Sequence, residues 1–296
     1  MVYTVKTFIV CITLINMLMF KANIFSQNKS YSVIYDTINV YLSDSNYEDA
    51  KRRFELLLKE YPVDPAERLL FAHKALAFGD IKYFKGEAVL MMRDFGWHYS
   101  YEDTLNDGST TEDIKKHGLV EWLVKKSEIL YPKWIQKNPS GYLVQKEVEK
   151  ICAIDHTRSY FYHLLYDDLI SDSAAIKYIQ NELNNMDYSN ILAVRSLCER
   201  YGLPNNFDHG YNTYYGVTYL LHHSMYGEMN IERVWTALFP YLEKAYFDGK
   251  ISYTFFYQYD LRLFKTTGYQ YYGTMSDDVP NIDSENVNER KRKYSL

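Results

Sequence analysis

The chain of 296 residues has no excess of positive charge. Its 38 aspartate and glutamate residues outnumber its 33 lysine and arginine residues, which gives a formal net charge of −5 at pH 7. A protein that binds nucleic acid through the phosphate backbone needs a face rich in lysine and arginine. We therefore expect no nucleic-acid partner.

The sequence also lacks the short motifs of common enzymes and metal proteins. It contains no G-x-S-x-G nucleophile motif, no H-E-x-x-H zinc motif, no phosphate-binding P-loop and no paired C-x-x-C. Nothing in these patterns implies a cofactor, and we predict none.

Cysteine is scarce, with only three residues in the chain. Cys11 lies near the N-terminus, whereas Cys152 and Cys198 accompany aliphatic residues at helical spacing, as buried thiols do. An oxidising compartment would permit a bridge between these two residues. The sequence leaves both possibilities open, two free thiols or one disulfide.

No apolar run is long enough to predict a membrane span with force. The longest, Thr7 to Phe20, follows the basic Lys6 and precedes the small residue Ser26, which is the pattern of a secretory signal peptide. We predict a signal peptide over residues 1–26, a periplasmic or extracellular protein, and no stable membrane span after cleavage. An N-terminal segment that stays uncleaved as a membrane anchor is the alternative.

Apolar residues in the rest of the chain recur at helical spacing, which predicts an all-α fold. Two predicted helix starts, Asn46-Tyr47 and Asp80-Ile81, are 34 residues apart, and this is the tetratricopeptide period. We predict a tetratricopeptide-like helical-hairpin array over residues 27–110, packed on a multi-helix domain over residues 111–275. A polar tail, 276–296, would follow. The concave face of such an array favours a peptide or protein partner.

Polar motifs punctuate the helices of the C-terminal half. In order, they are Asp155-His156 with Arg158, Gly202-Leu203-Pro204, His222-His223, Asp260 with Arg262, and Gln270-Tyr271-Tyr272-Gly273-Thr274. This series resembles the D-Q/R, G-W-P, Q-H, acid–arginine and Q-x-Y-G-T-Q motifs of the bacterial domain-of-unknown-function family 6624. His156, Leu203 and His222 stand where the family has Gln, Trp and Gln. The resemblance implies kinship and identifies no reaction.

These motifs and the helical pattern define a candidate polar site in the C-terminal domain. Asp155 continues the apolar face of Val148 and Ile151, so we expect a buried carboxylate that is hydrogen-bonded or paired, with Arg158 as the nearest partner in the sequence. A purely structural tie between two helices is the alternative. The complete candidate site consists of Asp155, Arg158, His223, Asp260, Gln270 and Tyr272.

Three functions stay open from the sequence. The first, which we favour, is an exported helical binding or interaction protein with a polar pocket in the C-terminal domain. The second is a hydrolase in which Asp155 or Asp260 orients His223 as a general base. The third is a metal-binding protein with ligands among Asp155, His156, His223 and Asp260, although their spacings match no known ligand motif.

Overall fold

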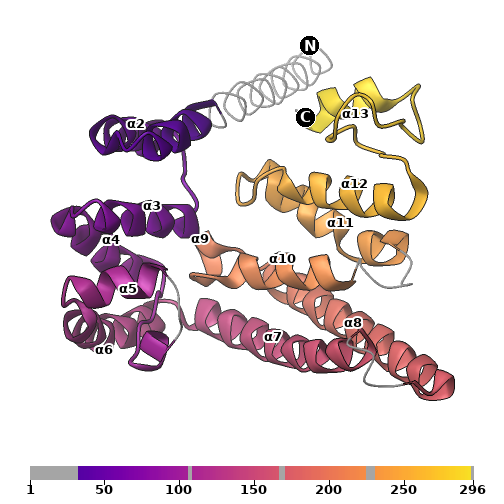
Figure 1. Cartoon of the computed structure of the whole chain (residues 1–296), viewed down its shortest axis with the longest axis horizontal. Helices are drawn as coiled ribbons and strands as arrows, with labels where there is room; N and C mark the ends of the chain where they lie inside the picture. Colours follow the sequence, from indigo (N-terminus) through magenta and orange to yellow (C-terminus); the bar gives the residue numbers. More distant parts are fainter. Residues whose placement is uncertain (1–32, 106–108, 167–170, 225–230, 295–296) are drawn as a thin grey trace, which may run out of the picture. The chain divides into compact units, whose positions relative to one another are not determined.

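The computed structural model describes residues 33–105, 109–166, 171–224 and 231–294 (Figure 1). Every regular element in these ranges is helical, and none of them contains a β-strand. The predicted all-α fold is confirmed. The predicted signal peptide, residues 1–26, lies outside the described residues.

A helical stretch over residues 33–43 comes first. The helices that follow it are α2 (Tyr47–Glu60), α3 (Pro65–Ala77), α4 (Ile81–Asp94), the 3-10 helix η1 (Glu102–Leu105), α5 (Ser109–Lys116), α6 (Val120–Lys137), α7 (Pro139–Tyr166), α8 (Ser173–Tyr201), α9 (Asn206–His209), α10 (Thr213–Ser224), α11 (Ile231–Phe247), α12 (Thr254–Thr267) and α13 (Val287–Tyr294). No helix among the described residues combines the length and the apolar character that a membrane crossing requires.

The chain divides into two compact units. Of the described residues, the first contains 33–63 together with 288–294, and the second runs from Asp64 to Val287. The predicted boundary near residue 110 therefore lies inside the second unit, and α3 and α4 belong to the same unit as α7 to α12.

Helix α2, in the first unit, begins at the predicted start Asn46-Tyr47. The side chain of Asn46 accepts a hydrogen bond from the backbone N–H of Asp49, which satisfies one of the unpaired N–H groups at the helix start. Ala50, Phe54 and Leu57 are completely buried along one face of the helix. The spacing of these three residues is the amphipathic pattern that the sequence shows.

Helices α3 and α4 form a packed hairpin at the start of the second unit. Asp64 caps α3 by accepting from the N–H of Ala66 at 2.7 Å, and Asp80 caps α4 by accepting from the N–H of Tyr83 at 3.0 Å. Across the hairpin, Arg68 donates two hydrogen bonds to Glu87, at 3.0 and 2.9 Å. Both side chains are largely buried, and this bidentate geometry fixes the register of the two helices.

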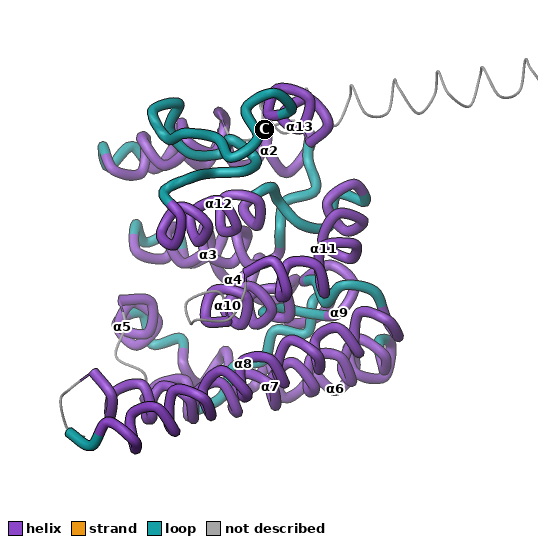
Figure 2. The backbone as a smooth tube through the Cα atoms, turned by 90° about the vertical axis from the view of Figure 1, so that its right-hand side faces the viewer, coloured by secondary structure: helices purple, strands orange, loops and turns teal. Residues whose placement is uncertain are grey.

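The two longest helices, α7 and α8, pack along each other, and α10 packs on both of them. Figures 1 and 2 show α10 lying between this pair and α12. The approach of α10 to α7 depends on Gly216, because a Cβ atom there would lie 2.5 Å from Cγ1 of Val148 and 3.0 Å from Sγ of Cys152. Glycine at this position therefore permits a helix contact that a larger residue would push apart.

The apolar core beside this helix pair joins α3, α4, α5 and α6. Its buried members are Leu69, Ala72, Leu76, Phe84, Ala88, Met91, Met92, Trp97, Tyr99, Ile114, Leu119, Leu123 and Val124. The core also contains two aromatic residues, Trp97 and Tyr99, from the connection between α4 and η1. Through Trp97 and Tyr99, this connection is anchored in the core at its first residues.

Candidate functional site

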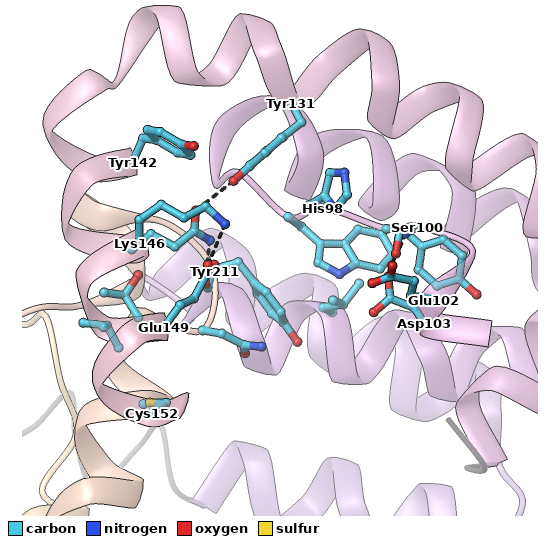
Figure 3. Close-up of a pocket in the computed structure, with 18 of the residues that line it drawn as sticks. His98, Ser100, Glu102, Asp103, Tyr131, Tyr142, Lys146, Glu149, Cys152 and Tyr211 are labelled. Carbon is cyan, nitrogen blue, oxygen red and sulfur yellow. Dashed lines mark hydrogen bonds and ion pairs between the residues drawn. The ribbon is translucent and has the colours of Figure 1, made fainter. Parts of the chain in front are cut away.

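A cavity of about 1040 Å³ lies within the second unit. Its walls come from α3, the segment 97–103, α5, α6, α7 and residues 211–216. Figure 3 shows Tyr131 and the α7 residues Tyr142, Lys146 and Glu149 on one side, and the segment from His98 to Asp103 on the other. The cavity brings together parts of the sequence from both predicted regions, 27–110 and 111–275.

The segment 95–103 forms a wall because its backbone is held at several points. Gly96 takes a φ of +64°, which redirects the chain after α4. The carbonyl oxygen of Phe95 accepts from the N–H of Tyr211 at 2.6 Å, and the N–H of Tyr99 donates to Oγ of Ser127 at 3.0 Å. These bonds tie the wall to α6 and to the start of α10.

Aromatic rings cover much of the cavity wall and contact one another. The ring of Trp97 lies 5.9 Å from that of Tyr99 and 6.5 Å from that of Tyr211, both edge-on. Tyr131 lies 4.8 Å from the imidazole of His98 and 6.4 Å from the ring of Tyr142. Contacts of this kind hold rings in fixed orientations, since edge-on and tilted pairs are the favoured geometries.

One buried amide connects three sides of the cavity. Gln145, on α7, is 8% exposed, and its Oε1 accepts from the hydroxyl of Tyr131 on α6 at 3.3 Å. Its Nε2 donates to the carbonyl oxygen of Tyr211 at 3.1 Å. Because both ends of the amide are used, Gln145 fixes the walls relative to one another.

Burial shifts the pKa values of three groups of the cavity lining, His73, Tyr131 and Tyr211, away from neutrality. Burial raises the pKa of Tyr131 to about 12, with smaller contributions from Glu149 and Tyr142, and burial likewise raises the pKa of Tyr211 to about 12. Burial lowers the pKa of His73 to about 4. The cavity therefore presents neutral phenols and a neutral imidazole near pH 7.

The thiol of Cys152 is also held in its neutral form. Burial raises its pKa to about 11, and the nearby carboxylates of Asp155 and Glu149 add to the shift. A cysteine acts as a nucleophile only as the thiolate, so this residue is a poor nucleophile near pH 7. Cys152 and Cys198 are both free thiols in the structure.

The charged side chains of the lining fall into two groups. On α7, Lys146 donates to Glu149 at 2.5 Å. On the opposite wall, Oδ2 of Asp103 accepts from the N–H and the hydroxyl of Ser100, at 2.7 and 2.9 Å, and Glu102 is exposed beside it. Figure 3 shows Glu102 and Asp103 together on this wall.

Among the residues predicted for the polar site, Asp260 has the most complete set of partners. It is fully buried on α12, and its Oδ1 accepts from the N–H groups of Tyr271 and Tyr272 at 2.8 and 2.9 Å. Its Oδ2 accepts from the N–H and the hydroxyl of Thr274 at 2.9 and 2.7 Å. The carboxylate thus fixes the turn that follows α12.

Gln270 and Tyr272 belong to the same cluster. Nε2 of Gln270 donates to the carbonyl oxygens of Ser276 and Val279 at 3.1 and 2.8 Å, and its Oε1 accepts from the N–H of Met275 at 2.9 Å. The hydroxyl of Tyr272 accepts from Nε1 of Trp235 at 3.2 Å. The structure therefore brings together three of the six predicted residues, in contacts that fold residues 270–282 back on α12.

The other three predicted residues lie on other helices. Asp155 is 1% exposed on α7, as the apolar stripe predicts, and α10 lies between α7 and α12 in both views (Figures 1 and 2). Arg158 on α7 and His223 on α10 have side chains outside the described residues. Where side chains are described, no group of three or more His, Cys, Asp or Glu is placed to hold a metal ion. His223 is part of both the predicted hydrolase site and the predicted metal site. Because its side chain lies outside the described residues, both sites stay predictions.

The cavity is not predicted from the sequence. Its most informative sequence signal is the aromatic run Trp97-His98-Tyr99, which directly follows Gly96 in a segment with weak helical pattern. Trp97 and Tyr99 of this run are buried, but the sequence does not show that α6, α7 and residue 211 face them. No protein-family model matches the chain, and comparisons with characterised proteins and with solved structures also find no match. The resemblance to family 6624 stays a prediction.

Proposed function

We propose that the protein is an exported helical binding protein and that the cavity between segment 97–103, α6, α7 and α10 is its ligand site. The observation that carries the proposal is the cavity wall itself, in which aromatic rings are oriented by mutual contacts and by the hydrogen bonds of Gln145. Ligand sites are concave, largely apolar and aromatic, with a few fixed polar groups. A wall held in place before binding also reduces the entropy that a ligand must offset.

Three buried groups of the cavity, His73, Tyr131 and Tyr211, are better suited to hydrogen bonding than to proton transfer near pH 7. A general acid or base works best with a pKa near the working pH, whereas burial moves the pKa values of His73, Tyr131 and Tyr211 to about 4, 12 and 12. Neutral phenols and imidazole can still donate and accept hydrogen bonds. The described groups therefore suit recognition.

The partner we propose is a peptide or a protein segment. Two observations support this choice: the cavity includes part of the α3–α4 hairpin through Leu69 and His73, and hairpins of this kind form peptide-binding grooves in helical arrays. Export is proposed from the signal-like pattern of residues 1–26.

The cavity contains its own reporter of occupancy. Cys152 lines the cavity, whereas Cys198 is buried on α8 away from the lining. We would first screen peptides and small molecules by thermal shift, because a ligand that binds only the folded state raises the unfolding temperature. Each hit would then be added during iodoacetamide labelling at pH 9, with mass spectrometry of the two cysteine-containing peptides.

We expect a ligand of the cavity to slow the labelling of Cys152 and to leave the labelling of Cys198 nearly unchanged. Equal protection of both thiols would indicate general stabilisation by binding elsewhere and would contradict the proposed site. A broad screen that yields no stabilising ligand would contradict the binding function.

A further inference from the structure

We infer that the ligand of this cavity carries a primary ammonium or guanidinium group, which binds between the aromatic rings and the carboxylates of Glu102 and Asp103. This inference rests on the proposed binding function and specifies the chemistry of its ligand. The matching ligands are a lysine or arginine side chain of a peptide and a free alkylamine. Each of them presents a cationic group with N–H donors.

The aromatic lining is the first reason. Trp97, Tyr99, Tyr131, Tyr142 and Tyr211 all line the cavity, and the faces of such rings carry negative potential that attracts cations. The wall itself contains one cation–π contact, in which Nζ of Lys146 lies 5.8 Å from the ring centroid of Tyr142.

The distribution of charge is the second reason. The lining contains three carboxylates, Glu102, Asp103 and Glu149, and one lysine, Lys146. Lys146 donates to Glu149 on the α7 wall, so the acidic excess lies on the opposite wall. There, both hydrogen bonds from Ser100 go to Oδ2 of Asp103, which leaves Oδ1 as the acceptor for a ligand. A cationic group is the natural complement of this wall.

Two polar atoms of the lining residues supply the third reason. The hydroxyl of Tyr99 and Nδ1 of His73 are buried without a hydrogen-bond partner among the described residues, and Tyr99 is only 6% exposed. Buried polar atoms are usually satisfied, so such exceptions need an explanation. Both atoms can accept a hydrogen bond, His73 in the tautomer protonated at Nε2. A primary ammonium or a guanidinium has the N–H donors that both acceptors lack, whereas a quaternary ammonium has none.

Isothermal titration calorimetry with matched probes tests the inference. The peptide probes are acetyl-Gly-Lys-Gly-amide and the same peptide with norleucine, which has an alkyl chain of similar shape without the charge. Butylammonium serves as the free-amine probe. The proteins are the native chain, Glu102→Gln, and Glu182→Gln as a control that removes an exposed carboxylate from α8, outside the cavity lining.

We expect the lysine peptide to bind at least about tenfold more tightly than the norleucine peptide, because only the charged group gains the ring and carboxylate contacts. Glu102→Gln should lower the affinity for the lysine peptide roughly fivefold and leave the affinity for the norleucine peptide unchanged. Glu182→Gln should change neither. Higher salt should weaken the binding of the lysine peptide and leave the binding of the norleucine peptide unchanged, because Glu102 is exposed and salt screens its attraction to the ammonium group. Butylammonium binding equal to that of the lysine peptide would assign the site to free amines, and weaker binding would assign it to basic peptides.

Equal affinities for the lysine and norleucine peptides would overturn the inference, and so would the absence of binding by every cationic probe. These failures remain distinct from failure of the binding function. If the thermal-shift screen gives a ligand that protects Cys152 while the cationic probes do not bind, the cavity is a ligand site of another chemistry. If no ligand is found by either experiment, both proposals fail.

Discussion

The indole of Trp134 is held between two glycines, and this arrangement gives the sharpest test of the cavity wall. Trp134 is 2% exposed on α6. A Cβ atom on Gly96 would lie 2.6 Å from three atoms of its ring, and a Cβ atom on Gly210 would lie 2.8 Å from two others. Real Cβ atoms do not approach other atoms this closely, so alanine at either position must displace the ring or the wall.

The expected cost of Gly96→Ala has two parts. Gly96 takes a φ of +64°, and a left-handed conformation costs a residue with a Cβ atom about 1 kcal/mol. Overpacking against a ring in a filled site adds about 2 kcal/mol. Together these terms lower the free energy of unfolding by about 3 kcal/mol, which corresponds to a decrease of about 6–12 °C in Tm for a unit of this size.

Gly118 provides a matched control, because it has the same φ of +64° and a Cβ atom there would meet no atom within 4 Å. Gly118→Ala should lower Tm by only about 2–4 °C. Thermal and urea unfolding, followed by circular dichroism, compare the two variants. The double variant Gly96→Ala/Trp134→Leu should be less destabilised than the sum of its single changes, since the smaller side chain removes the clash. Equal effects of the two alanine substitutions, or strict additivity in the double variant, would refute the reasoning.

Three further outcomes follow from the site. The pKa of His73 is lowered from 6.5 to about 4, so the unfolded chain takes up a proton before the folded chain as the pH falls. The free energy of unfolding of the native protein, relative to that of His73→Gln, should therefore decrease by about 3 kcal/mol between pH 7 and pH 4. A difference in urea unfolding that stays constant over this pH range would contradict the prediction. With a pKa of about 11, Cys152 in the folded protein should react with iodoacetamide at pH 9 about 50-fold more slowly than in denatured protein, and equal rates would show an ordinary thiol. Asp260→Ala leaves three backbone N–H groups without their acceptor and should lower the free energy of unfolding by at least about 3 kcal/mol. Thr274→Val should lower it by about 1 kcal/mol. If chemical denaturation gave similar losses for the two variants, the turn would not depend on the carboxylate.

The sequence predicts the helices well because their ends carry local chemical signals. Asn46 and Asp80 lie at the two predicted helix starts, and each caps its helix by accepting from a backbone N–H, as Asp64 does for α3. Gly202 and Gly268 end α8 and α12 with positive φ values, which glycine adopts without strain. These signals act within a few residues of the chain and need no knowledge of the tertiary fold.

The cavity could not be predicted in this way because its walls meet only in the folded unit. Gln145 contacts the carbonyl oxygen of Tyr211, 66 residues away in sequence, and nothing in the local pattern of α7 distinguishes this glutamine from a surface residue. The 34-residue step between Asn46 and Asp80 does correspond to two similar capped helices. The two helices belong to different compact units, so the repeat predicts local structure without fixing the domain boundary.

Buried carboxylates show where sequence reasoning reaches its limit. The apolar stripe of α7 predicts that Asp155 lies on a buried face, and in the structure Asp155 and Asp260 are both 1% exposed or less. Burial demands a compensating partner, but it does not say which kind. For Asp260 the partners are backbone N–H groups and a hydroxyl of its own turn, so its charge is used to organise the chain. In the cavity, Glu102 and Asp103 are less buried and line an open space. A carboxylate therefore marks a binding site when it faces space that another molecule can occupy, and this property depends on the tertiary structure.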